Sequence, residues 1–193
     1  MKFFRSTEFI IAGVLLAAMV IIGTINPAFW SLDNIFGLLR SNVVIGIMAL
    51  GVLLVMISGG IDVSFTAFAI AAMYLTVRAM VYLGYDGVLV PFVAATLIGL
   101  ALGAFNGFII HRFRMIPLIV TLGTGSIVRG LVLGLVGTSI VNINKMPKEL
   151  IGFGKTDVIS LTSATGSTFG LTAMFVVYMG LALVIHLVLT YTM

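Results

Sequence analysis

Long apolar runs separated by short polar stretches make up most of this chain. Six of these runs are continuous and near the length of about 20 residues at which a helix crosses a bilayer. The strands of a membrane barrel would instead alternate apolar and polar residues. The pattern therefore predicts an all-α integral membrane protein with about six transmembrane helices. We expect the spans at residues 8–25, 43–57, 63–83, 88–110, 116–141 and 169–190.

Two of the connections between spans have a character of their own. Before the second span, Ser31 or Asp33 is suited to cap a short amphipathic helix. The apolar side of that helix would carry Ile35, Leu38 and Leu39. Residues 142–168 are rich in Lys, Gly, Ser and Thr, and we expect them to form an extracytoplasmic loop. Residues 1–193 otherwise form a single transmembrane domain.

The composition agrees with this pattern and excludes several classes of protein. Hydrophobic residues make up 61% of the chain and charged residues 8%, against roughly 25% charged residues in soluble domains. With no cysteine, the chain has no disulfide and no Cys-ligated metal. His111 and His186 are too far apart for a two-histidine metal motif, and no phosphate-binding loop occurs. We therefore predict no catalytic residue and no metal ligand.

The basic residues predict how the chain crosses the membrane. Lys2 and Arg5 precede the first span, and Arg112 and Arg114 separate the fourth from the fifth. Six spans place both pairs on one side, which the positive-inside rule makes cytoplasmic. Charges on the opposite side are Arg40, Lys145, Lys148 and Lys155, the last three in the long loop, where the rule is weaker. The net charge of +4 is thus a topology signal, and no nucleic-acid partner is expected.

A charged break separates the second span from the third. Gly59 and Gly60 end one helix, and Asp62 followed by Ser64 begins the next. The carboxylate of Asp62 is suited to accept hydrogen bonds from the free N–H groups of that first turn, where the helix dipole favours its charge. A capped turn therefore explains the aspartate without a ligand. The alternative is that Asp62 and Ser64 line or gate a substrate path.

Glycines four residues apart predict close helix packing. Gly99, Gly103 and Gly107 lie on one face of the fourth span, and Gly130 with Gly134 repeats the spacing on the fifth. Small residues at this spacing let another backbone approach closely. We interpret both sets as packing surfaces.

Polar side chains within two spans are further candidates for a substrate path. Asn106 either bonds to another helix or faces a cavity. Thr121, Thr124 and Ser126 indicate either a broken helix beside a path or hydroxyls that bond back to carbonyls one turn earlier.

Arg129 adds a positive charge to the same span. It either reaches the interface or is buried and paired. We hypothesise that it pairs with Asp62, because both are charges at membrane depth.

Three blocks of sequence resemble a known family, and the third, LALVIHLVLTYTM at residues 181–193, looks like the span just before that family's cytoplasmic coupling segment. Residues 31–64, which end in GGIDVS, and residues 103–131, which contain PLIVTLGT and RG, are similar to the permease subunits of bacterial ABC importers for monosaccharides, of the ribose-permease type. The resemblance implies a permease for ribose or a related sugar. Branched-chain amino acids or nucleosides are alternative substrates on the same scaffold, and a scaffold protein without transport is the alternative from another class.

The resemblance also implies partners and a location. An ABC ATPase subunit would bind ATP and Mg²⁺, so this chain itself would hold no cofactor. An extracytoplasmic sugar-binding protein would deliver substrate to the loop at 142–168, and a second permease copy or a sister permease would complete the path. The protein would lie in the bacterial inner membrane with its N-terminus cytoplasmic. Family members continue past the sixth span into a coupling segment, so we expect a truncated or partial permease, which would not transport without that segment.

Overall fold

The computed structural model describes residues 7–137, 139, 141–162 and 168–192. Within them, six helices are long and apolar enough to cross a membrane, which confirms the all-α membrane fold. These are α1 (Thr7–Ile25), α2 (Leu32–Ile57), α3 (Phe65–Leu83), α4 (Leu89–Phe113), α5 (Pro117–Leu131) with its π-helical continuation η3 (Val132–Val136), and α7 (Ala173–Thr192). The shorter elements are η2 (Pro27–Trp30), η4 (Ile143–Lys145), α6 (Lys148–Lys155), β1 (Asp157–Thr162) and β2 (Thr168–Thr172).

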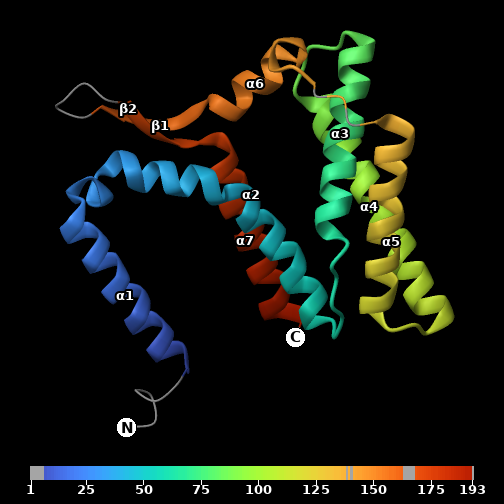
Figure 1. The fold of residues 1–193 in the computed structure, drawn as a ribbon, viewed down its shortest axis with the longest axis horizontal. Helices are drawn as coiled ribbons and strands as arrows, with labels where there is room; N and C mark the ends of the chain where they lie inside the picture. The colour runs from blue at the N-terminus through green and yellow to red at the C-terminus, as the bar shows by residue number, and fades with distance from the viewer. Residues whose placement is uncertain (1–6, 138, 140, 163–167, 193) are drawn as a thin grey trace.

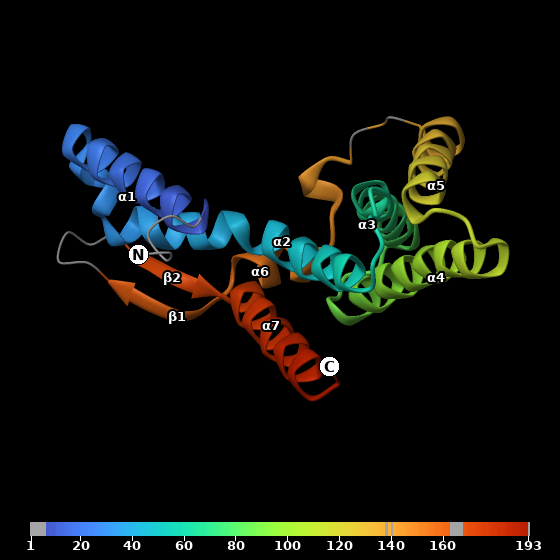
Figure 2. The ribbon, with the colours of Figure 1, turned by 90° about the horizontal axis from the view of Figure 1, so that it is seen from below.

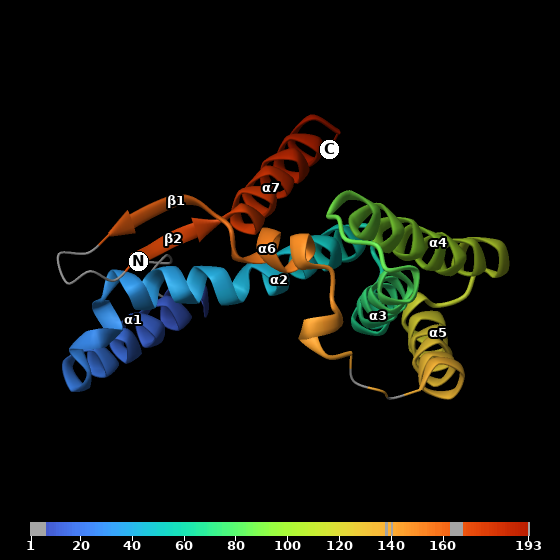
Figure 3. The same cartoon turned by 90° about the horizontal axis from the view of Figure 1, so that it is seen from above.

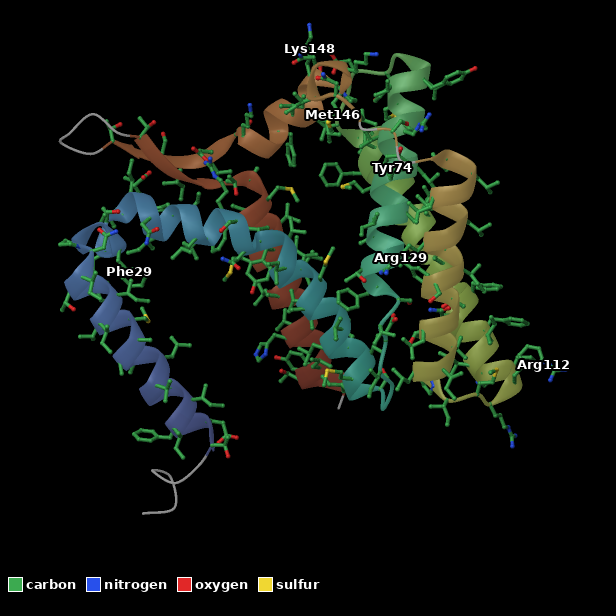
Figure 4. All side chains as sticks on the ribbon, in the orientation of Figure 1. Phe29, Tyr74, Arg112, Arg129, Met146 and Lys148 are labelled. Carbon is green, nitrogen blue, oxygen red and sulfur yellow. The ribbon has the colours of Figure 1, made fainter. Side chains whose placement is uncertain are left out.

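The long helices alternate in direction. The start of α1, the turn between α4 and α5, and the end of α7 all lie toward the lower end of the molecule in Figure 1. The β hairpin and α6 lie at the upper end, and Arg112 lies at the lower end in Figure 4. This arrangement agrees with six crossings. Lys2 and Arg5 lie outside the described residues, and the cytoplasmic location of the lower end stays a prediction.

The helices form two groups, visible from below in Figure 2 and from above in Figure 3. In one group α2 packs against α7 and the hairpin, and in the other α3 packs against α4 and α5. The buried apolar residues gather on α3, at positions such as Ala67, Phe68 and Ala71. By contrast, 0% of the spanning stretch of α7 is buried within the described chain. Most apolar surface outside the α3 group is therefore free to meet lipid or other protein.

The short amphipathic helix expected before the second span is not a separate helix but the first part of α2. The Oγ of Ser31 accepts from the backbone N of Asn34 at 3.2 Å and caps α2, which then continues through the whole span. The helix changes direction part-way along (Figure 1). Ser41 and Asn42 both donate to the carbonyl of Leu38, at 3.1 and 2.8 Å. Side chains that bond back in this way bend a helix without ending it.

The polar stretch at 142–168 is more ordered than a simple loop. It holds η4, α6 and β1, and β1 pairs antiparallel with β2 in a register that sets Leu161 opposite Phe169. Because residues 168–172 join this hairpin, the last span begins at Ala173 and not at residue 169. An ion pair between Arg40 and Asp157 ties the hairpin to α2.

Candidate functional site

An extended segment joins α2 to α3. Gly59 has a φ of +80°, in the left-handed region that favours glycine, and turns the chain after α2. The prediction that the second helix ends at these glycines is confirmed. The backbone then runs without helix or strand as far as Ser64 and rises beside the α4–α5 pair to the start of α3 (Figure 1). Irregular backbone at membrane depth requires partners for its polar groups.

Thr121 on α5 supplies some of these hydrogen-bond partners. Its Oγ1 accepts from the backbone N of Val63 at 3.3 Å. Its hydroxyl hydrogen is shared between the carbonyls of Ile61 and Leu118, each at 3.3 Å. One buried threonine therefore binds a donor and an acceptor of the extended segment. Thr121 was selected from sequence, and the structure confirms that it meets this segment.

Asp62, Ser64 and Asn106 form a second, connected network. Oδ1 of Asp62 accepts from the N of Ser64 at 2.7 Å and from its Oγ at 2.6 Å. Nδ2 of Asn106, on α4, donates to the same Oγ at 3.0 Å. Ser64 is 0% exposed and Asn106 5% exposed. The interpretation of Asn106 as a bond to another helix is confirmed, although its buried Oδ1 has no partner in the described part of the chain.

Asp62 does not cap the first turn of α3, and that prediction was wrong. The helix begins at Phe65, two residues later than expected, so the N–H within reach of the carboxylate is that of Ser64. The result is an Asx turn before the helix. It leaves the carboxylate just before the N-terminus of α3.

Close packing of α5 holds the same network in place. A Cβ on Gly125 would lie 3.2 Å from Cα of Ser64, nearer than ordinary van der Waals contact, so only glycine fits here without displacement. Gly60 also lies near α5, but a Cβ there would meet Pro117 at 3.5 Å, which is ordinary van der Waals contact. Gly125 was not singled out from the sequence, although the glycines among the hydroxyls of α5 were a signal for it.

The remaining hydroxyls do not break α5. Thr124 donates to the carbonyl of Val120 at 2.9 Å, and Ser126 donates to that of Leu122 at 2.8 Å. The helix runs on to Leu131, so the expectation of back-bonding was right and that of a broken helix wrong. Hydroxyls that bond to their own helix leave the backbone bonds in place.

The proposed pair between Asp62 and Arg129 is not formed. Among the described residues the salt bridge joins Arg40 to Asp157, and the side chain of Arg129 on α5 is exposed. Arg129 is eight residues beyond Thr121, about 12 Å along the helix axis. That distance places it well above the level of the carboxylate.

The glycine faces have no partner inside the described chain. A Cβ on Gly99, Gly103 or Gly107 would meet nothing within 4 Å outside its own helix, and the same holds for Gly130 and Gly134. Their assignment as packing surfaces therefore stays a prediction.

Sequence reasoning missed Arg78 and Tyr74 on α3. Nη1 of Arg78 donates to the carbonyl of Val136 at 2.7 Å and to Oγ of Ser139 at 2.9 Å. The hydroxyl of Tyr74, labelled in Figure 4, lies 2.8 Å from the carbonyl of Ser139. Together they hold the end of η3, where the fifth span stops at Val136 instead of residue 141. An arginine one turn after a tyrosine inside an apolar span was the available signal.

A hollow separates α2 from the start of α3. It measures about 240 Å³, and Asp62 is among its lining residues. A second hollow of about 600 Å³ continues it along α2. Both are lined by Met48, Val52 and Phe65, so they are adjoining parts of one cleft.

Residues 34–193 match the family described as the permease component of the branched-chain amino acid transport system. The chain belongs to this permease family. It is 33% identical over 128 residues to the ribose import permease protein RbsC of Escherichia coli, covering 66% of this chain and 39% of that protein. It is 33% identical over 153 residues to the autoinducer 2 import system permease protein LsrD of an Enterobacter species, covering 77% and 46%. A probable ABC transporter permease protein of Sinorhizobium fredii, y4mJ, is 37% identical over 123 residues, covering 61% and 34%.

The chain therefore spans less than half the length of these relatives. No solved structure matches it. Membership of the family makes it a multi-pass membrane protein of the permease type.

Proposed function

We propose that this chain forms part of the transmembrane permease of an ATP-driven importer that receives a monosaccharide, such as ribose, from a binding protein. The observation that carries the proposal is the match of residues 34–193 to a permease family, together with relatives named as ribose and autoinducer 2 import permeases. The polar network at the α2–α3 break supports it, because discontinuous segments of this kind border substrate paths in transporters.

The proposed machine needs partners. An ABC ATPase subunit would hydrolyse ATP with Mg²⁺ on the cytoplasmic side, where we place the N-terminus and the turn at Arg112. A sugar-binding protein would dock outside, near the α6 and hairpin region of 142–168. A second permease copy or a sister permease would pack against the free helix faces, including the glycines of α4.

A second candidate is import of branched-chain amino acids, which the description of the family favours. The two candidate functions differ in the substrate that is imported, so an uptake assay distinguishes them. We would produce the gene product that carries this sequence together with its copurifying ATPase and binding protein, in sealed vesicles. ATP-dependent uptake of labelled D-ribose, absent when the catalytic carboxylate of the ATPase is neutralised, is the expected result. Uptake of leucine without uptake of ribose, any other sugar or adenosine would overturn the proposal.

A further inference from the structure

We propose that the cleft between α2 and α3 contains a subsite for a neutral, polyhydroxylated substrate, in which Asp62 accepts hydroxyl hydrogens and Phe65 covers an apolar face. The inference rests on the proposed function and adds to it the chemistry of recognition within the membrane. In this proposal Ser64 and Asn106 are positioning residues that orient the carboxylate of Asp62.

The shape of the cleft fits a small molecule. The first hollow, of about 240 Å³, opens into the second, of about 600 Å³, within the scale of roughly 300–1,000 Å³ of small-molecule sites. The residues that line the first are apolar except for Asp62. Its lining residues are Met48, Gly51, Val52, Val55, Asp62 and Phe65. A mostly apolar wall with one placed polar group is the usual design of a binding site.

The carboxylate keeps capacity for a ligand. Both of its hydrogen bonds to Ser64 end on Oδ1, so among the described residues Oδ2 takes part in neither of them. An ionised carboxylate only accepts hydrogen bonds. It therefore selects a group that donates, as each hydroxyl of a sugar does, and it disfavours an anionic substrate such as a sugar phosphate.

The direction of the carboxylate is set from α4. Asn106 donates to Oγ of Ser64, and this Oγ can then direct its own hydrogen only to Asp62. Thr121 fixes the residues on either side of Asp62. The buried network thus holds one carboxylate oxygen of Asp62, a residue that also lines the cleft.

Phe65 and Gly51 suit the apolar part of a sugar. Phe65 lines both hollows, and the negative face of its ring is complementary to the polarised C–H groups of a pyranose or furanose. A Cβ on Gly51 would meet nothing within 4 Å, so this position of α2 leaves open space across the cleft.

These 193 residues contain no cysteine, which permits a direct test once any cysteines elsewhere in the transporter are replaced. Val52→Cys places a thiol in the cleft, and Val44→Cys is the matched control on the same helix, outside the residues that line the two hollows. In the complete transporter, D-ribose should slow the reaction of a methanethiosulfonate reagent with the Val52→Cys thiol at least fivefold. It should leave the Val44→Cys thiol unchanged, and ribose 5-phosphate should protect neither.

Asp62→Asn, combined with Val52→Cys, should raise the ribose concentration needed for protection at least tenfold. Phe65→Leu gives a second reading if the first variant fails to assemble, and it should weaken protection in the same direction. A Val52→Cys transporter that imports ribose while its thiol is unreactive, or reacts at the same rate with and without ribose, overturns the subsite and leaves the proposed function intact. A transporter that imports only leucine overturns the proposed function itself.

Discussion

Replacing Ser64 with alanine should destabilise the folded chain by about 2.5 kcal/mol. The hydroxyl donates to Asp62 at 2.6 Å and accepts from Asn106 at 3.0 Å. Loss of the charge-assisted bond accounts for about 1.5–3 kcal/mol. The unpaired amide of Asn106, which is buried, adds about 1 kcal/mol or more. We take the low end of the sum because hydrogen bonds between membrane helices average about 0.6 kcal/mol.

Unfolding by SDS in mixed micelles would measure this loss. Ser126→Ala is the matched control, because that hydroxyl is on an exposed side chain and bonds to the carbonyl of Leu122 in its own helix at 2.8 Å. We expect the control to change the free energy of unfolding by less than about 0.5 kcal/mol. Equal midpoints for the two alanine variants would refute the role of Ser64 as the junction of the network.

A double-mutant cycle sharpens the test. Asn106→Leu removes the amide N–H that Ser64→Ala leaves unpaired, and it also removes the buried Oδ1 that already has no partner among the described residues. The double variant should therefore lose about 1 kcal/mol less free energy of unfolding than the two single variants lose together. Strict additivity would show that the hydrogen bond between the two side chains does not contribute.

Two further predictions concern α5. Gly125→Ala should lower the free energy of unfolding by about 1–3 kcal/mol, because its Cβ would lie 3.2 Å from Cα of the pinned Ser64. Gly123→Ala meets nothing within 4 Å, so the control should be neutral or slightly stabilising, and equal loss in both would contradict the contact. Arg78→Leu removes the 2.7 Å bond to the carbonyl of Val136, so hydrogen exchange in η3 should rise about tenfold. Unchanged exchange there would show that the arginine does not hold this helix end.

The local features of the chain were readable from sequence. Continuous apolar runs predicted six spans, and paired glycines at 59 and 60 predicted the break before α3, since both signals depend on a few neighbouring residues. Boundaries were less accurate where distant segments meet. The last span begins at Ala173 because the residues before it pair with β1, a contact that no local pattern announces.

The candidate site was identified in part. Asp62, Ser64, Asn106 and Thr121 were named as polar residues at membrane depth, and they do meet around one segment. Arg129 was named on the same grounds and does not join them. The difference is the rise of α5, which determines which turn of the helix faces the segment.

Sequence alone thus determined that this chain enters a membrane, that it has six helices long enough to span one, and that α2 ends at Gly59 and Gly60, because the bilayer requires apolar side chains and satisfied backbone over each span. Only the tertiary structure decided which residues of other helices contact the segment between α2 and α3. Asn106 reaches Ser64 across 42 residues of sequence, and Gly125 admits the backbone of Ser64 at a distance where an added Cβ would be crowded. Such contacts depend on the rotation and depth of each helix, which packing between helices sets.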